Sequence, residues 1–85
     1  MCNKFKKAFG QNLRKIRQET SYTQEKLALE SGISRSHIAM IEAGKRDITL
    51  TNLFKISRAL GISLSELFEF DDTEMFQFDI EELYK

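Results

Sequence analysis

Proline is absent from this 85-residue chain, and glycine occurs only four times. These two residues are the strongest breakers of helices and the commonest residues of turns, so their scarcity favours helical segments. Hydrophobic residues recur every three or four positions, which is the spacing of one face of an α-helix. The composition and this spacing together predict a mostly helical protein.

Cysteine and histidine occur once each, as Cys2 and His37. A single cysteine excludes an intramolecular disulfide, and one Cys with one His cannot supply the ligands of a structural zinc site. His37 has no plausible nucleophile partner in the sequence, and no glycine-rich phosphate loop is present. We therefore expect no enzyme, no metal, no cofactor and no small-molecule ligand.

Long apolar runs are also missing. No stretch approaches the roughly 18 apolar residues of a membrane span, and the basic N-terminus MCNKFKKAF has no extended apolar segment. We see no internal repeat and no low-complexity segment, and the length suits one small domain. These absences predict a single domain without a membrane partner, and a cytoplasmic location follows by default.

The net charge of zero conceals an uneven distribution. Residues 1–68 contain 12 Lys and Arg against six Asp and Glu, whereas residues 69–85 contain one Lys against seven acids. A phosphate backbone would meet the charge of the domain and not that of the whole chain. The basic body is therefore compatible with a nucleic-acid partner despite the neutral total.

The segment from residue 23 to residue 42 predicts two short helices joined by a tight turn at residues 31–33. Ser34 is a good N-cap for the second helix, and Gly44 is a good residue just past its end. A helix of about nine residues is not stable alone in water, so its apolar residues must pack against neighbours. The second helix is therefore expected to belong to a folded helix pair.

The second helix presents two different faces. Ile38, Ile41 and Glu42 share one face, while the opposite face is small and carries no carboxylate. Arg35 lies in the first turn, and Lys45 and Arg46 follow the last. Because the major groove of double-stranded DNA admits such a helix, the pair is predicted to be a helix-turn-helix. The expected outward residues are Ser36, Ala39, Met40 and Ala43.

A set of residues spread along the chain forms a recognisable pattern: Thr23-Gln24-Glu25, Leu27-Ala28, Gly32, Ile38, Ile41-Glu42, Gly44, Leu53, Ile56, Ala59-Leu60-Gly61 and Ser63. With these residues the chain resembles the DNA-binding domain of the phage repressor and Cro family over roughly Phe9 to Phe68. Within that family, the segments Ser34–Ile38 and Lys45–Ile48 are most similar to controller proteins of restriction-modification systems. The resemblance implies an all-α fold of five helices over residues 1–70, whereas the change to an acidic, aromatic composition sets residues 71–85 apart as an extension.

The other helices have signals of their own. A stripe of apolar residues predicts a first helix from about Phe5 to Glu19. Thr49 is the expected N-cap of a fourth helix that Gly61 ends, and a capping box in residues 63–66 opens a fifth. The apolar residues are Phe5, Phe9, Leu13 and Ile16 in the first helix, Leu50, Leu53, Phe54, Ile56 and Leu60 in the fourth, and Leu64, Leu67 and Phe68 in the fifth.

The family resemblance also implies roles for single residues. Arg17 resembles the family arginine that pairs with the glutamate at Glu42, and the alternative is a solvated surface arginine. Gln24 resembles a phosphate clamp at a helix start, and the alternative is an ordinary exposed residue. Side-chain chemistry and position on the second helix give the expected base contacts, which are Arg35, Ser36, Ala39 and Met40. The expected backbone contacts are Thr23, Gln24, Ser34, His37, Lys45 and Arg46. Three alternatives stay open: a phosphate contact for Ser36, plain helix surface for His37 and minor-groove entry for Arg46.

Asp47 departs from the pattern of controller-like sequences, which often have Asn after the arginine. DNA phosphates would repel a carboxylate at this position. Two explanations remain open from the sequence: Asp47 turns away from the DNA, or the loop that contains it sits differently on the duplex.

A regulator of this kind is expected to act as a symmetric homodimer on a palindromic operator, with half-sites roughly 34 Å apart. We expect the dimer surface on the fifth helix. Leu64, Phe68 and Phe70 would lie there, although a place in the core of one subunit is an alternative. Contact with RNA polymerase through Glu25 or Glu30 is a further expectation from the resemblance.

The acidic extension contains aromatic residues among its carboxylates. Alternation of Phe76, Phe78 and Ile80 with polar residues suggests a strand, whereas Ile80, Leu83 and Tyr84 suggest a helical turn. We expect Phe76 and Phe78 to dock opposite the second helix of the pair, beside the dimer surface, and to support dimerisation. The alternative function is an antitoxin-like interaction module whose tail binds a protein partner.

Overall fold

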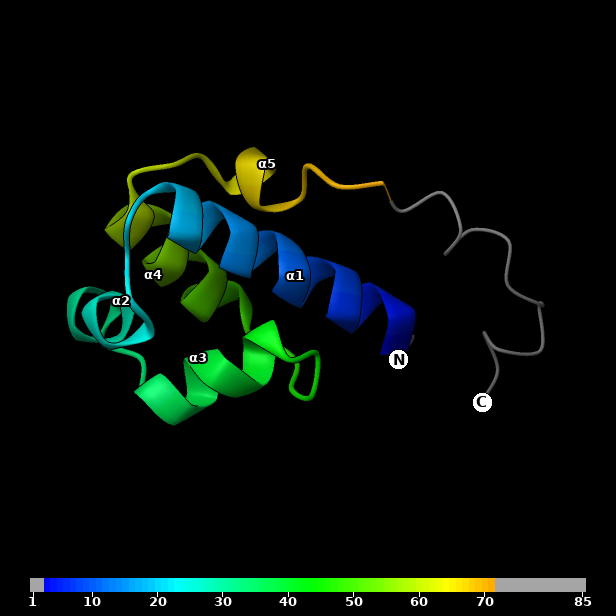
Figure 1. The fold of residues 1–85 in the computed structure, drawn as a ribbon, viewed down its shortest axis with the longest axis horizontal. Helices are drawn as coiled ribbons and strands as arrows, with labels where there is room; N and C mark the ends of the chain where they lie inside the picture. Colours follow the sequence, from blue (N-terminus) through cyan, green and yellow to red (C-terminus); the bar gives the residue numbers. More distant parts are fainter. Residues whose placement is uncertain (1–2, 72–85) are drawn as a thin grey trace.

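The computed structural model describes residues 3–71, which form α-helices and, within that range, no strand (Figure 1). This confirms the prediction of an all-α fold with five helices. The first helix begins at Asn3, earlier than the expected Phe5. None of the helices in the described range is long and apolar enough to cross a membrane. The helices are α1 (Asn3–Glu19), α2 (Gln24–Ser31), α3 (Arg35–Glu42), α4 (Leu50–Leu60) and α5 (Leu64–Leu67).

Side-chain caps define where the four later helices begin. In each, a Ser or Thr side chain accepts a hydrogen bond from a backbone N–H three residues further on. Gly32 and Gly61 end α2 and α4 with φ angles of 76° and 70°, in the left-handed region that glycine adopts without strain. Ser31 therefore belongs to α2 and not to the turn. The N-caps are Thr23, Ser34, Thr49 and Ser63, and the last forms the predicted capping box with Glu66.

The core lies between the helices and is built mainly from aliphatic side chains. The apolar stripe of α1 buries Phe9 and Leu13, as the spacing predicts. On α4, by contrast, Leu50 and Phe54 are 79% and 53% exposed, so only part of its apolar set faces the core. The buried apolar residues of the described range are Phe9, Leu13, Leu27, Ile33, Ile38, Ile41, Ile56, Leu60 and Leu67.

Helix α3 lies at the lower edge of the molecule in Figure 1, and α1 and α2 pack against its inner side. Helix α4 packs against α2 and α5, and α5 also packs against α1. Asn12 of α1 fixes α5 by donating its side-chain amide to the carbonyl oxygen of Leu67, at 2.8 Å. One long face of α3 is consequently left free of other helices.

Aromatic contacts bring the chain back to α1 after α5. The ring of Phe68 lies 5.2 Å from that of Phe9, and the ring of Phe70 lies 5.9 Å from that of Phe5. Figure 1 shows this segment running over α1 toward its N-terminal end. The expected strand or helical turn and the docking of Phe76 and Phe78 lie outside the described residues.

Helices α1 and α3 approach each other closely at Gly10. A Cβ atom on Gly10 would lie 2.6 Å from the carbonyl oxygen of Glu42 and still closer to that of Ile41. Both neighbours are backbone atoms, which cannot rotate away as a side chain can. Gly10 therefore allows the short separation between the two helices.

We predict that Gly10→Ala lowers the free energy of unfolding by roughly 1 to 3 kcal/mol, because the added methyl group forces α1 away from α3. Helix propensity alone would raise the free energy of unfolding by about 0.8 to 1.0 kcal/mol, because alanine favours a helix more than glycine does. Urea denaturation measures the difference. Gln11→Ala, at an exposed position of the same helix, is the control, and unchanged or increased stability of Gly10→Ala would contradict the prediction.

Candidate nucleic-acid interface

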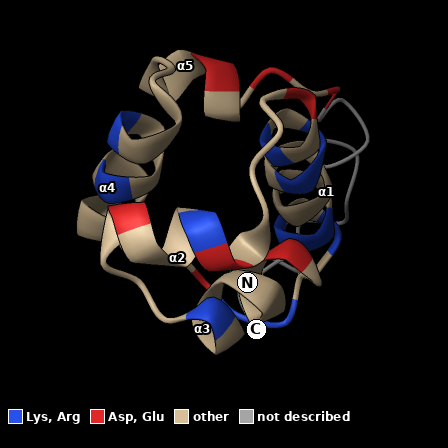
Figure 2. Ribbon diagram, turned by 60° about the vertical axis from the view of Figure 1, so that its left-hand side comes forward, with Lys and Arg blue, Asp and Glu red and all other residues tan. Residues whose placement is uncertain are grey.

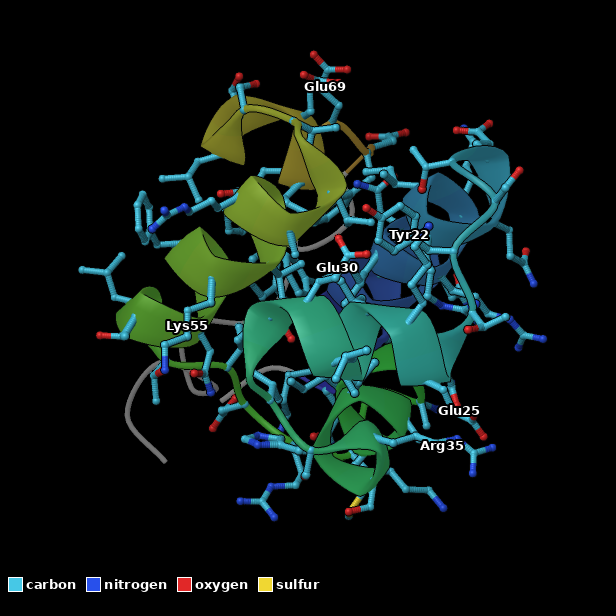
Figure 3. The ribbon with its side chains drawn as sticks, turned by 90° about the vertical axis from the view of Figure 1, so that its left-hand side faces the viewer. Tyr22, Glu25, Glu30, Arg35, Lys55 and Glu69 are labelled. Atoms are coloured by element: carbon cyan, nitrogen blue, oxygen red, sulfur yellow. The ribbon has the colours of Figure 1, made fainter. Side chains whose placement is uncertain are left out.

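Helix α3 has a buried face and a solvent face. Ile38 and Ile41 are buried in the core, whereas Arg35, Ser36 and Met40 are exposed. Figure 3 shows the Arg35 side chain extending from the first turn of α3 into solvent. Of the other expected outward residues, Ala43 is also exposed and Ala39 is half-buried, as is His37 on the flank of the helix.

Behind this face, Arg17 of α1 and Glu42 of α3 form a buried ion pair. Arg17 Nε lies 2.6 Å from Glu42 Oε2, and Arg17 Nη2 lies 3.0 Å from Glu42 Oε1. The two residues are 8% and 7% exposed, so the solvated alternative for Arg17 does not hold. This two-point contact matches the planar fork of a guanidinium and fixes the rotation of α3 against α1.

The same pair also fixes the start of α2. Gln24 donates its side-chain amide to Glu42 Oε1 at 3.0 Å, and Arg17 Nη1 donates to the carbonyl oxygen of Tyr22 at 2.8 Å. A glutamine amide carries two N–H bonds, and Glu42 occupies one of them. The second N–H and the side-chain carbonyl oxygen of Gln24 stay available, in a side chain whose orientation is set from inside the protein.

A hollow of about 360 Å³, open to solvent, lies where α2 begins beside α3. Figure 3 shows Glu25 and Arg35 next to each other at this edge, one from each helix. The N–H groups at the start of α2 and the nearby guanidinium favour an anion here, whereas Glu25 opposes one. The hollow is lined by Arg17, Tyr22, Thr23, Gln24, Glu25 and Arg35.

The loop after α3 keeps Lys45 and Arg46 exposed and turns Asp47 toward α1. Asp47 Oδ1 lies 3.9 Å from Lys6 Nζ, although the Asp47 side chain remains 62% exposed. Of the two explanations for this departure from the family pattern, the geometry favours a carboxylate that turns to another partner. Lys6 therefore offsets part of the negative charge of Asp47.

Tyr22 was not identified from the sequence, although it joins three elements. Its hydroxyl lies 2.9 Å from Glu30 Oε1 and 3.0 Å from the carbonyl oxygen of Ala59, and Lys26 Nζ lies 4.5 Å from its ring centroid. The hydrogen bond to Glu30, then burial and the charge of Glu30, raise the pKa of the Tyr22 hydroxyl. Nothing in the local sequence indicates these contacts, because Ala59 is 37 residues away.

The expected dimer residues have mixed surroundings. Leu64 and Phe68 are each 41% exposed, while Phe70 is half-buried against Phe5. The exposed Leu50 and Phe54 of α4 add further apolar surface. Within residues 3–71 no group of three or more His, Cys, Asp or Glu side chains could hold a metal ion.

Residues 13–67 match the sequence profile of a family described as Helix-turn-helix, which is more than half of the chain. The matched range contains the capped helix pair α2 and α3 and the exposed face of α3. The chain therefore belongs to the helix-turn-helix family of repressor and Cro type, as the residue pattern indicated. Members of this family are DNA-binding transcription regulators and not enzymes.

Several proteins similar to this chain are control proteins of restriction-modification systems or have names of that kind. It is 48% identical over 67 residues to the control protein C.MunI of a Mycoplasma species, covering 78% of this chain and 90% of the relative. It is 42% identical over 71 residues to the control protein C.BamHI of Bacillus amyloliquefaciens, covering 82% and 88%. The restriction-modification controller protein C.AhdI from Aeromonas hydrophila has a similar structure, with a TM-score of 0.73, 41% identity and coverage of 74% and 96%.

We predict that Glu42→Gln lowers the free energy of unfolding by roughly 3 to 5 kcal/mol, because it leaves the buried Arg17 charge without its partner. Thermal or urea denaturation measures the loss. The double variant Arg17→Met with Glu42→Gln should recover part of it, since no unpaired charge then remains. Equal stability of the single variant and the parent chain would show that the pair contributes nothing to folding.

Proposed function

We propose that this protein is a controller-type transcription regulator of a restriction-modification system that binds a palindromic operator as a homodimer. The observation that supports the proposal most directly is the first turn of α3. Arg35 is exposed there on a helix anchored from behind by Glu42, and Lys45 and Arg46 follow that helix. The names of C.MunI, C.BamHI and C.AhdI support the controller assignment.

Sequence recognition falls to the solvent face of α3. Arg35 has the length and the planar fork to bind guanine O6 and N7 together. Ser36 contacts a base edge, and the apolar side chains of Ala39 and Met40 meet thymine methyl groups. Because α3 rests on a packed core, these side chains approach the major groove from a rigid support.

Backbone contacts flank the recognition surface. The hydroxyls of Thr23 and Ser34 already accept N-cap hydrogen bonds. Thr23 keeps its own hydrogen to donate to a phosphate oxygen, and Ser34 has one to donate when Ser36, whose Oγ lies 3.5 Å away, is the donor of their shared contact. Gln24 donates its second N–H in the same way. On the other side of α3, Lys45 and Arg46 supply charge, and His37 lies between the two groups of contacts. These residues position the helix without distinguishing bases.

A dimer is needed because one helix covers too few base pairs for useful specificity. The apolar side chains exposed on α4 and α5 offer a surface for it. Leu50 and Phe54 lie one helical turn apart on α4, and Leu64 begins α5. Phe68 adds its exposed part, while Phe70 supports the surface through its contact with Phe5.

Contact with RNA polymerase would most readily use Glu25 of α2. Glu30 on the same helix already accepts a hydrogen bond from Tyr22, whereas Glu25 is exposed beside the DNA-facing edge (Figure 3). Such a contact would make the regulator an activator at operators placed next to a promoter.

Selection of bound sequences from random DNA duplexes tests the proposal as a whole. We expect the selected sequence to be a palindrome with two preferred half-sites. The mass of the complex should correspond to two protein chains on each duplex. An asymmetric site bound by one chain would contradict the homodimer. A failure to enrich any sequence would contradict sequence-specific binding.

We predict that Arg35→Ala lowers affinity for the selected duplex by roughly 1 to 3 kcal/mol and lowers affinity for a scrambled duplex much less. The reason is that a base contact contributes only when the correct base is present. Titration of both duplexes at one salt concentration measures the difference. An equal loss on the two duplexes would make Arg35 a phosphate contact.

Arg46→Ala serves as the comparison variant. It should weaken binding to both duplexes and reduce the slope of log K against log salt by about 0.9, because it removes one charge that contacts phosphate. Lys55→Ala on α4 is the charge control. Figure 3 shows Lys55 well away from Arg35, so this variant should leave the salt slope unchanged.

We predict that Phe54→Ser raises the dimer dissociation constant by about tenfold or more, equivalent to ~1.4 kcal/mol or more, because it removes an apolar anchor from the proposed surface. Sedimentation equilibrium measures the constant. Leu29→Ser is the control: Leu29 is 83% exposed but lies on α2, outside the proposed surface. Equal effects of the two variants would assign the interface elsewhere.

A further inference from the structure

The solvent face of α1 is cationic along most of its length. Its positively charged members are exposed and lie opposite the face that packs into the core. Before Glu19, α1 contains no acidic residue, and its first turn therefore combines positive side chains with the positive end of the helix dipole. Figure 2 shows several Lys and Arg positions on this helix. The exposed cations are Lys4, Lys7, Arg14 and Lys15.

The fold places the N-terminal half of α1 beside the loop that follows α3. A Cβ atom on Gly44 would lie 2.6 Å from Lys7 Cγ and 2.8 Å from Lys7 Cα, so the two backbones almost touch. Lys6 forms an ion pair with Asp47 on the same loop. The start of α1 and the loop after α3 therefore form one positive region, although they are distant in the sequence. We call this region the cationic cluster; it consists of Lys4, Lys7, Lys45 and Arg46.

The chain that follows α5 is directed to the same end of the molecule. The contact of Phe70 with Phe5, with ring centroids 5.9 Å apart, holds the chain at the first turns of α1. The segment that continues from there, residues 72–85, contains five acids and a single Lys. A strongly acidic segment therefore starts next to a strongly basic surface.

We propose that the acidic extension, residues 72–85, binds the cationic cluster in the DNA-free protein and competes there with DNA phosphates. Its carboxylates substitute for phosphate oxygens, which makes the extension an intramolecular inhibitor of DNA binding. The proposal rests on the proposed function for its consequence, but the contact itself exists without DNA. It assigns a role to the lysines of α1 and to the extension together.

Length and tethering both allow this contact. Fourteen extended residues span up to roughly 46 Å, whereas α1 with 17 residues is about 25 Å long. A tethered segment acts at an effective concentration of about 1 mM or more, so individually weak ion pairs suffice. Because the contact stabilises the free protein, it lowers affinity for cognate and non-cognate duplexes by the same factor.

The test uses the full chain with its five carboxylates neutralised as Asp72→Asn, Glu74→Gln, Asp79→Asn, Glu81→Gln and Glu82→Gln. We expect about tenfold tighter binding of both the selected and the scrambled duplex at low ionic strength. The gain should shrink as the ionic strength rises from 0.01 M to 0.15 M, because the Debye length falls from about 30 Å to about 8 Å. Unchanged or weaker binding at low salt would overturn the proposal.

A second measurement uses no DNA. Backbone amide chemical shifts of the cationic cluster should differ between the parent and the neutralised chain, while those of Lys55 and Arg58 on α4 should not. If the chemical shifts of the cluster differ but neither chain binds DNA, the contact between the extension and the cluster is supported and the proposed function is rejected. Equal shifts at α4 would indicate a general charge effect and overturn the proposal.

Substitution of the cluster provides the matched control. Lys4→Gln with Lys7→Gln should remove most of the gain from neutralising the extension, whereas Lys55→Gln with Arg58→Gln should leave it intact. Both pairs remove the same charge, so only position differs. A weaker dimer in the neutralised chain, with no change at the cluster, would assign the extension to dimerisation and overturn the inhibitory role.

Discussion

The buried contact between Arg17 and Glu42 connects every element of the candidate interface. Through it α1 holds the end of α3, while Gln24 at the start of α2 bonds to the same carboxylate. A buried carboxylate without a charged partner would lower the stability of the fold, so Glu42 requires the guanidinium of Arg17. The orientation of a solvent-facing helix is thus set by a charge pair that solvent scarcely reaches.

The charged residues fall into a buried pair and a set of exposed cations, and the two have different roles. The buried pair is neutral as a unit and determines geometry, whereas the exposed cations of α1, α3 and the following loop determine what the surface attracts. Asp47 lies between these roles, since Lys6 offsets its charge at the edge of the interface. The acidic extension adds a counter-charge on the same chain, which explains how a protein of zero net charge can have a basic candidate interface.

Much of the architecture was predictable because helix ends have local chemical signals. Thr23, Ser34, Thr49 and Ser63 cap helices through bonds that reach only three residues along the chain. The buried and exposed faces of α3 followed from its periodicity for the same reason. On α4 the sequence identified the apolar residues but not which of them face the core, because an apolar side chain such as Phe54 has the same pattern at the core and at an exposed surface.

The sequence by itself therefore determined the helical class, the caps of the four later helices, the helix-turn-helix pair and the separation of basic and acidic segments. Only the tertiary structure decided which side chains meet across long separations: Tyr22 with Ala59, Lys6 with Asp47, and Phe5 with Phe70. The physical reason is range. Caps and periodicity depend on neighbours within one or two turns, whereas these contacts depend on how whole helices pack, which no local pattern encodes.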